Sequence, residues 1–242
     1  MTEKSIQNLI NILNTGNYKE TYKEQIFLRQ ISENVFLSKI SSEITSPKIK
    51  PYYFIYFFFI SNEREKFIGA IEDRGINDLH WYITKESRKN GYLTKALKDT
   101  IIPYIFNDEN KDYDRQRITI NKNYLSETNY LNSKKVAINL GFEALNEDET
   151  EFELIKEYFD WSNENITEKN KLISGERTEL LKEKISNLHY EFEKICCELE
   201  MSYGNENILL EQLLENSRNI EYSKSKVDNL IFIQNDKINN IG

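Results

Sequence analysis

The chain has 242 residues, of which 39% are hydrophobic, and its 32 basic against 40 acidic side chains give a formal net charge of −8 at pH 7. This length accommodates one sizeable domain and an appendage, and the hydrophobic content is sufficient for a packed core. The two cysteines, Cys196 and Cys197, are adjacent, and there are two histidines, so a disulfide framework and a multi-histidine metal centre are excluded. We expect a protein of a reducing compartment that works without a metal.

The sequence contains no apolar run of membrane-spanning length, and residues 1–12 are amphipathic and acid-containing, unlike a signal peptide. We therefore expect a cytoplasmic protein without a membrane partner. The abundance of Asn, Lys and Ile is typical of an AT-rich bacterial genome and carries no information on function.

Hydrophobic periodicity predicts the first elements of the chain. An amphipathic helix is predicted over residues 3–14 and a short strand over 25–31. Helical spacing of apolar residues predicts a second helix over 33–44, which Ser46 and Pro47 would end. The run of aromatic and isoleucine residues at 52–60 predicts a strand buried on both faces.

The middle of the chain continues this alternation of strands and helices. Strands are predicted over 67–72 and 78–84, separated by a turn, and a helix follows over 94–106. The remaining predictions are a strand at 117–122, a helix that ends in Leu140-Gly141-Phe142, and a strand pair at 142–145 and 151–155. The predicted order is β-α-β-β-β-α-β-α-β-β, which indicates an α/β domain with a mixed sheet and helices on both sides.

The most informative segment is the hexapeptide Arg88-Lys89-Asn90-Gly91-Tyr92-Leu93, which lies between a predicted strand and a predicted helix. A turn at a helix N-terminus directs several free backbone N–H groups toward one point, and this arrangement suits a pyrophosphate. The segment therefore favours a cofactor with a nucleotide tail.

The hexapeptide resembles the R/Q-x-x-G-x-G/A loop of the GNAT family of N-acetyltransferases, and residues 133–142 resemble the second signature of that family. The resemblance covers residues 25–156 and is closest to the branch that acetylates N-terminal amines of ribosomal proteins. It implies the acyl-CoA N-acyltransferase fold and acetyl-CoA as co-substrate, with the loop on the pyrophosphate and strand 78–84 beside the pantetheine. The cofactor-binding residues that it implies are Tyr82, Ile83, Arg88, Lys89, Asn90, Gly91, Tyr92, Leu93 and Thr94.

The resemblance also implies catalytic residues. A carboxylate at the start of strand 78–84 is a common general base of the family, and Asp78 matches that position. His80 lies on the same face and would suit the role as a neutral imidazole, so we favour it slightly over Asp78. Ser133 matches a serine that can donate a hydrogen bond to the leaving sulfur, although it could equally be a helix N-cap. Tyr124 and Tyr130 are further candidates for the acid role.

Leu93 departs from the family pattern, which has Gly or Ala at this position. Its side chain would either point into the core or crowd the pyrophosphate. The second case would mean weak or lost CoA binding.

The composition changes near Tyr158, and we predict a domain at 1–157 followed by a helical extension at 158–242. Residues 158–242 hold ten basic and sixteen acidic side chains, a net charge of −6. Apolar residues recur at steps of four and three in two segments, 165–203 and 206–236, which predicts a helical hairpin or coiled coil. The apolar positions are Leu181, Ile185, Leu188, Phe192, Ile195 and Leu199, then Leu209, Leu213, Ile220, Val227 and Leu230. The hairpin could pack on itself, on the first domain, in a homodimer or on another protein.

The leading functional hypothesis is an acetyl-CoA-dependent N-acetyltransferase that acts by direct attack of an amine, either a protein N-terminus, a lysine or a small amine. An alternative is a catalytically degenerate scaffold of the same fold that works through its C-terminal helices. A third hypothesis, acetylation of aminoacyl-tRNA, requires a basic surface, and the net charge argues against a nucleic-acid partner. The scattered basic residues that could contribute to such a surface are Arg115, Arg117, Lys122, Lys134 and Lys135.

Overall fold

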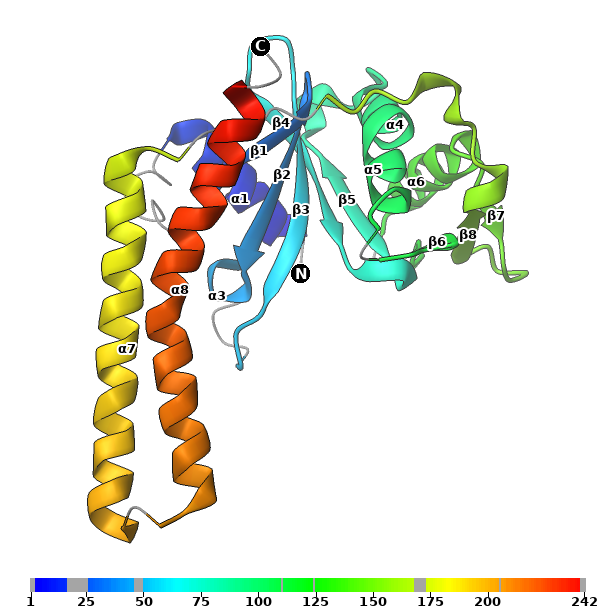
Figure 1. Ribbon diagram of the computed structural model, residues 1–242. Helices are drawn as coiled ribbons and strands as arrows, with labels where there is room; N and C mark the ends of the chain where they lie inside the picture. Colours follow the sequence, from blue (N-terminus) through cyan, green and yellow to red (C-terminus); the bar gives the residue numbers. More distant parts are fainter. Residues whose placement is uncertain are drawn as a thin grey trace. The chain divides into compact units, whose positions relative to one another are not determined.

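The structure is a computed structural model, and it divides the chain into two compact units, residues 1–170 and 171–242, which are considered one at a time (Figure 1). Unit 1 is a mixed α/β domain with two sheets, and unit 2 consists of two helices. In the described part of the chain, none of the helices combines the length and the apolar character that a bilayer crossing requires. The residues described are 3–16, 26–45, 50–109, 111–123, 125–167, 173–204 and 206–239.

Unit 1 contains a five-stranded sheet in which every strand pairs antiparallel with the next one along the chain. This meander leaves the first and last strands at its edges. The strands are β1 (Arg29–Ser32), β2 (Val35–Ser41), β3 (Phe54–Ser61), β4 (Phe67–Asp73) and β5 (Leu79–Ile83).

The helix predicted over 33–44 is wrong, because most of this segment is strand β2, followed by one helical turn, α3 (Ser42–Thr45). The apolar residues of the segment satisfy helical spacing, but β2 pairs with β3 along its entire length, from Val35 with Ile60 to Ser41 with Phe54. Cross-strand packing therefore decided the structure over local spacing.

The prediction that 52–60 is buried on both faces holds for half of the strand. Phe57, Phe58, Phe59 and Ile60 are at most 1% exposed, whereas Phe54 is 63% exposed. The buried half lies between the two layers of helices that cover the sheet.

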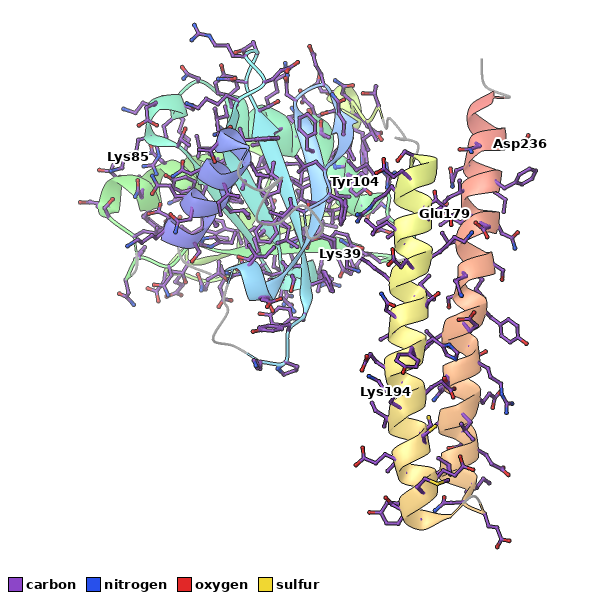
Figure 2. The ribbon with its side chains drawn as sticks, turned by 90° about the vertical axis from the view of Figure 1, so that its left-hand side faces the viewer. Lys39, Lys85, Tyr104, Glu179, Lys194 and Asp236 are labelled. Atoms are coloured by element: carbon purple, nitrogen blue, oxygen red, sulfur yellow. The ribbon has the colours of Figure 1, made fainter. Side chains whose placement is uncertain are left out.

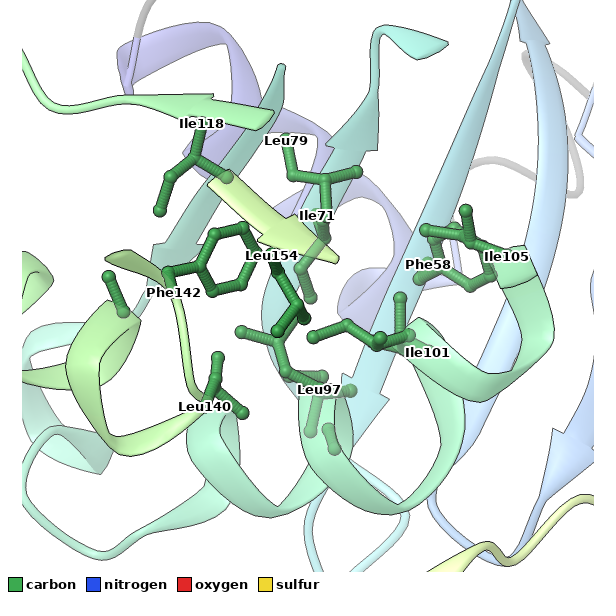
Figure 3. Close-up of a cluster of buried hydrophobic side chains, with 14 of the residues drawn as sticks. Phe58, Ile71, Leu79, Leu97, Ile101, Ile105, Ile118, Leu140, Phe142 and Leu154 are labelled. Carbon is green, nitrogen blue, oxygen red and sulfur yellow. The ribbon is translucent and has the colours of Figure 1, made fainter. Parts of the chain in front are cut away.

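Helix α1 (Glu3–Thr15) covers one face of the five-stranded sheet and buries Ile6, Leu9, Ile10 and Leu13 against it. The other face is covered by a continuous helix made of α4 (Tyr92–Ala96), a π-helical turn η3 (Leu97–Ile101) and α5 (Ile102–Phe106). Figure 3 shows the larger core cluster, to which this helix contributes Leu97, Ile101 and Ile105.

Pro103 accounts for the π-helical turn. It has no N–H to donate to the carbonyl four residues earlier, that of Asp99, and its ring displaces that turn of the helix. The freed Asp99 carbonyl accepts a hydrogen bond from Asn165 N at 2.6 Å. A segment far along the chain is thereby attached to the helix.

The second sheet of unit 1 has three antiparallel strands in the order β6-β8-β7. The strands are β6 (Arg115–Thr119), β7 (Glu143–Ala144) and β8 (Glu151–Ile155), and helix α6 (Glu127–Asn139) precedes β7. Phe142, Phe152 and Leu154 are buried and join this sheet to the larger core cluster.

Residues 158–167 belong to unit 1, whereas the prediction ended the first domain at residue 157. Phe159 and Trp161 pack on Phe106, with ring centroids 6.1 and 6.3 Å away. Thr167 N donates to Ile31 O at 2.9 Å, so this segment reaches β1. We call residues 158–167 the strap.

Unit 2 consists of the antiparallel helices α7 (Gly175–Tyr203) and α8 (Ile208–Asn239), whose side chains are drawn in Figure 2. The predicted hairpin is therefore present, and α7 begins with Ser174 as its N-cap, ten residues later than the predicted start of the segment. Two residues of the predicted stripe, Leu188 and Ile195, are 58% and 52% exposed.

Candidate functional site

A cleft opens in unit 1 where the two sheets diverge. Gln116, which is fully buried, donates from Nε2 to Gly75 O at 2.9 Å, and Thr119 N donates to Asp78 Oδ1 at 3.0 Å. These two hydrogen bonds hold strand β6 alongside the turn that leads into β5. Beyond Thr119 strand β6 ends while β5 continues, and the space between the two sheets opens.

Strand β5 forms one wall of this cleft with an unpaired backbone edge. Thr84 N donates to Ile68 O at 2.8 Å, and Arg74 N donates to Asp78 O at 3.1 Å, so the even-numbered residues 78–84 direct their backbone groups toward β4. The odd-numbered residues therefore direct theirs toward the cleft. These residues are Leu79, Trp81 and Ile83, and of their carbonyls that of Ile83 already accepts a hydrogen bond from Arg88 Nε.

The N-terminus of α4 lies at the far end of the same edge. Gly91 is the residue before the helix and has φ 78°, a left-handed conformation that glycine adopts without strain. No side chain caps this helix end, and the first intrahelical bond is donated by Lys95 N to Gly91 O. The amides of Tyr92, Leu93 and Thr94 are therefore available to an anion.

The edge and the helix end line one cavity of about 1030 Å³, at the upper end of the range for ligand pockets. Its other walls come from the end of β6 and from one face of α6. Of the predicted cofactor-binding residues, Asn90 is the one that does not line it. Polar residues that the sequence prediction missed also line it: Thr119, Asn121, Asn129, Asn132 and Asn139.

Arg88 attaches the loop to strand β5 and to helices α6 and α1. Its Nε donates to Ile83 O and its Nη1 to Asn129 Oδ1, both at 3.1 Å, and its Nη2 lies 3.7 Å from Glu3 Oε1. The guanidinium also lies over the ring of Tyr82. All three nitrogens thus have protein partners, so Arg88 positions the loop.

Lys89 and Lys135 supply uncompensated positive charge. Both are exposed and line the cavity, and in the described residues no acidic partner is recorded for either. The cavity therefore favours an anionic ligand near the helix end.

Leu93 and Tyr92 both pack against the larger core cluster. The Tyr92 hydroxyl lies 3.1 and 3.2 Å from the two carboxylate oxygens of Glu63, and this hydrogen bonding raises the pKa of Tyr92. The Leu93 side chain meets both predicted positions in part, because it packs against the core cluster and also contributes to the cavity wall.

The two candidate bases differ in their surroundings. Asp78 has both carboxylate oxygens engaged, Oδ1 with Thr119 N and Oδ2 with Arg74 Nη1 at 3.2 Å. His80 has a buried Nε2 without a hydrogen-bond partner among the described residues. Burial, together with the charge of Arg74, lowers the pKa of His80, so its imidazole is neutral at pH 7.

An ion pair between buried Glu72 and exposed Arg74 lies beside His80 and was not anticipated. Glu72 is 4% exposed and directly opposite His80 in the β4–β5 register. Its Oε2 lies 2.8 Å from Arg74 Nη2, and Arg74 also bonds Asp78. The position of this pair opposite His80 could not be predicted from the sequence, because it depends on the register of β4 and β5.

Ser133 lies in the middle of α6 and faces the cavity, so the prediction that it begins this helix is wrong. The N-cap is Ser126, whose Oγ accepts from Asn129 N at 3.3 Å. Tyr130 does not line the cavity, and its hydroxyl donates to Glu149 O at 3.0 Å. Tyr124 lies outside the described residues.

Four of the five scattered basic residues have partners. Arg115 and Arg117 pair with Glu153, Lys134 pairs with Glu149, and Lys122 lies over the ring of Tyr130. In the described ranges, no three or more side chains of the metal-binding types gather in one place.

Comparisons of this chain with protein-family models, with curated proteins and with solved structures give no match.

Proposed function

We propose that the chain is an acetyl-CoA-dependent N-acetyltransferase with the acyl-CoA N-acyltransferase fold, as the GNAT-like motifs in the sequence imply. The observation that carries the proposal is the continuity of two features in one cavity. The unpaired edge of β5 leads directly to the uncapped amides of α4. A linear arm with amide groups that ends in a pyrophosphate, as in coenzyme A, matches both features.

The charges of the cavity support a phosphorylated ligand. Lys89 and Lys135 add positive charge to that of the helix end, and the other cations of the lining, Arg74 and Arg88, are paired with acids. The arginine pairs hold the walls in position, while the lysines are available to phosphate oxygens.

Direct transfer requires a proton acceptor and a donor. The amine nitrogen attacks the thioester carbon, the C–N bond forms as the C–S bond breaks, and the amine proton passes to a base. His80, neutral at pH 7, is the base that the surroundings favour, because both oxygens of Asp78 already accept hydrogen bonds. The Ser133 hydroxyl is available to donate to the departing sulfur, and the acceptor is an amine of a protein or of a small molecule.

The alternative of a scaffold without catalysis is favoured by a different observation. Large apolar side chains of unit 2, among them Met201, Tyr203 and Phe232, are more than 70% exposed. Such exposure is typical of surfaces that bind other proteins. The scaffold hypothesis does not require binding of acetyl-CoA, so a binding measurement separates the two.

The first prediction concerns that binding. Isothermal titration should give micromolar affinity for acetyl-CoA, and Gly91→Glu should abolish it, because the added carboxylate would lie among the amides proposed for the pyrophosphate. An unpaired negative charge at such a site should weaken the binding free energy by more than about 3 kcal/mol, which is at least a hundredfold in affinity.

Gly16→Glu is the matched control for this variant. Gly16 and Gly91 have φ of 74° and 78°, and a Cβ added at either one would have no atom within 4 Å. Both substitutions therefore impose the same backbone strain, but Gly16 lies outside the cavity. Absence of binding by the unmodified chain, or equal loss in both variants, would contradict the proposal.

A further inference from the structure

One backbone edge of β6 faces the five-stranded sheet without pairing with it. Strand β6 bonds to β8 through the even-numbered residues 114–120, since Lys156 N donates to Asp114 O and Ile120 N donates to Thr150 O. The odd-numbered residues of an antiparallel strand direct their backbone groups to the opposite side. In the described structure β5 and β6 belong to different sheets, so no ladder from β5 satisfies these groups.

Two side chains bond to these backbone groups instead. Gln116 Nε2 donates to Arg117 O and to Gly75 O, both at 2.9 Å, and so links β6 to the turn before β5. Two residues further along β6, Thr119 N donates to Asp78 Oδ1 at 3.0 Å. Strands joined by a backbone ladder lie about 4.8 Å apart, whereas a side chain placed between two backbones holds them further apart.

The Asp78 carboxylate is held from two sides. Its Oδ2 accepts from Arg74 Nη1 at 3.2 Å, and Arg74 Nη2 lies 2.8 Å from Glu72 Oε2 on β4. A carboxylate with a backbone N–H on one oxygen and a guanidinium on the other is fixed in orientation by charge-assisted hydrogen bonds. Asp78 is therefore a defined link between β6 and the five-stranded sheet.

This link lies where the cavity begins. Asp78 and Thr119 both line the cavity, and Thr119 is the last residue of β6, whereas β5 continues to Ile83. The distance between the two strands at the link is thus the width with which the cavity starts. The unpaired edge of β5 stays accessible only while β6 is kept away from it.

We propose that Asp78 is a positioning residue, whose carboxylate joins β6 to β5 while keeping the two strands apart, and so holds the cavity open for its ligand. This role differs from that of general base, which the family resemblance implies for Asp78. The identity of the ligand, acetyl-CoA, rests on the proposed function, whereas the link can be measured without any ligand.

Amide hydrogen exchange at Thr119, followed by NMR in the full chain, measures the link. In Asp78→Ala this N–H loses its acceptor and should exchange about tenfold faster. The neighbouring Ile120 N–H donates to Thr150 O at 2.7 Å and should keep its rate, so it is the internal reference. Asp78→Asn retains an oxygen that can accept from Thr119, and it should restore the protection.

The affinity for acetyl-CoA measures the consequence for the cavity. Isothermal titration should give about tenfold weaker binding for Asp78→Ala than for the unmodified chain, and Asp78→Asn should restore most of the affinity. Thr119→Pro removes the same hydrogen bond from the donor side, because proline has no N–H. It should weaken binding to the same extent, and it replaces Asp78→Ala should that variant fail to fold.

Glu153→Ala is the matched control. Glu153 accepts from Arg117 Nε at 2.8 Å, and its side chain is 13% exposed, against 19% for that of Asp78. Both substitutions therefore remove a partly buried carboxylate that pairs with an arginine, but Glu153 does not line the cavity. Neither the exchange of Thr119 nor the affinity for acetyl-CoA should change in this variant.

Each other outcome contradicts a stated part of the proposal. Unchanged exchange of Thr119 in Asp78→Ala, or equal acceleration at Thr119 and Ile120, would overturn the link. Faster exchange of Thr119 alone with unchanged affinity for acetyl-CoA would overturn its role in the cavity. Absence of binding by the unmodified chain would refute the proposed function and the ligand named here, while the exchange of Thr119 would still decide whether the link exists.

Discussion

At the scale of single residues, the cluster of Glu72, Arg74, Asp78 and His80 has the strongest consequences. Three charged groups lie near one half-buried imidazole, and its buried Nε2 has no hydrogen-bond partner in the described structure. A buried polar atom without a partner costs free energy, so its presence is more readily explained by a ligand than by folding stability.

The pKa of His80 gives a prediction that does not depend on activity. Burial, and after it the charge of Arg74, lowers this pKa, so Arg74→Gln should raise it. The chain has two histidines, and NMR titration of both imidazoles in the intact protein measures the change directly. Arg74→Lys should restore the lowered pKa.

Arg117→Gln is the control, because Arg117 pairs with Glu153 outside the cavity and should leave His80 unaffected. The lowered pKa of His80 also determines how the free energy of unfolding depends on pH. The unfolded imidazole binds a proton near pH 6.5 and the folded one resists it, so the free energy of unfolding should decrease as pH falls below about 6.5. An unchanged titration of His80 in Arg74→Gln would contradict this account.

The turn at Gly91 could be predicted from the sequence because it is a local feature. Gly91 lies between a strand and a helix, and its left-handed conformation follows from a turn at that position. The role of Arg88 was beyond prediction, because its partners, Asn129 and Glu3, are 41 and 85 positions away in the chain. Ser133 was considered as a helix N-cap because it matches a serine of the GNAT resemblance, whereas the actual cap is Ser126.

At the scale of elements, the sheet strands with clear turns between them were predicted almost to their ends, and β8 was predicted without error. The segment that forms β2 was predicted wrongly as a helix. Its apolar residues satisfy both the helical and the strand periodicity, and pairing with β3 decides between them. In such segments the choice between helix and strand is made by tertiary contacts and not by intrinsic propensity.

The strap gives a prediction at this scale. Phe159 is 5% exposed and packs on Phe106 and Trp161, so Phe159→Ala should lower the free energy of unfolding by about 3 kcal/mol. Urea denaturation of the full chain, followed by circular dichroism, measures this loss. Tyr158→Ala, at a neighbouring side chain that is 73% exposed, should change it by less than about 0.5 kcal/mol.

The contacts of the strap also indicate where the folded domain of unit 1 ends. A chain that ends at residue 157 lacks Phe159 and the bond from Asn165 to Asp99, whereas one that ends at 170 retains both. Equal stability of the two truncated chains would show that the strap contributes nothing.

At the scale of the whole molecule, the two units carry separate natural probes. Both tryptophans, Trp81 and Trp161, belong to unit 1, and both cysteines belong to unit 2. Cys196 is buried between α7 and α8, and burial raises the pKa of its thiol, whereas Cys197 is exposed. Labelling of Cys196 therefore reports the opening of the hairpin.

We expect two transitions in urea. Tryptophan fluorescence should follow the unfolding of unit 1, and the labelling rate of Cys196 should follow that of unit 2 at a different midpoint, because the two units are separately compact. Cys197→Ser removes the fast-reacting thiol and leaves the slow one to be measured. Coincident midpoints would indicate that the two units unfold as one.

The unpaired edge of β5 has a consequence for solubility. A sheet edge on an open surface is a template for the strands of other molecules and promotes aggregation. Here the edge lies inside a cleft whose other walls are formed by α4, α6 and the end of β6. The recess thus places these backbone groups within a cavity and not on an open face of the molecule, where they would be a template for another strand.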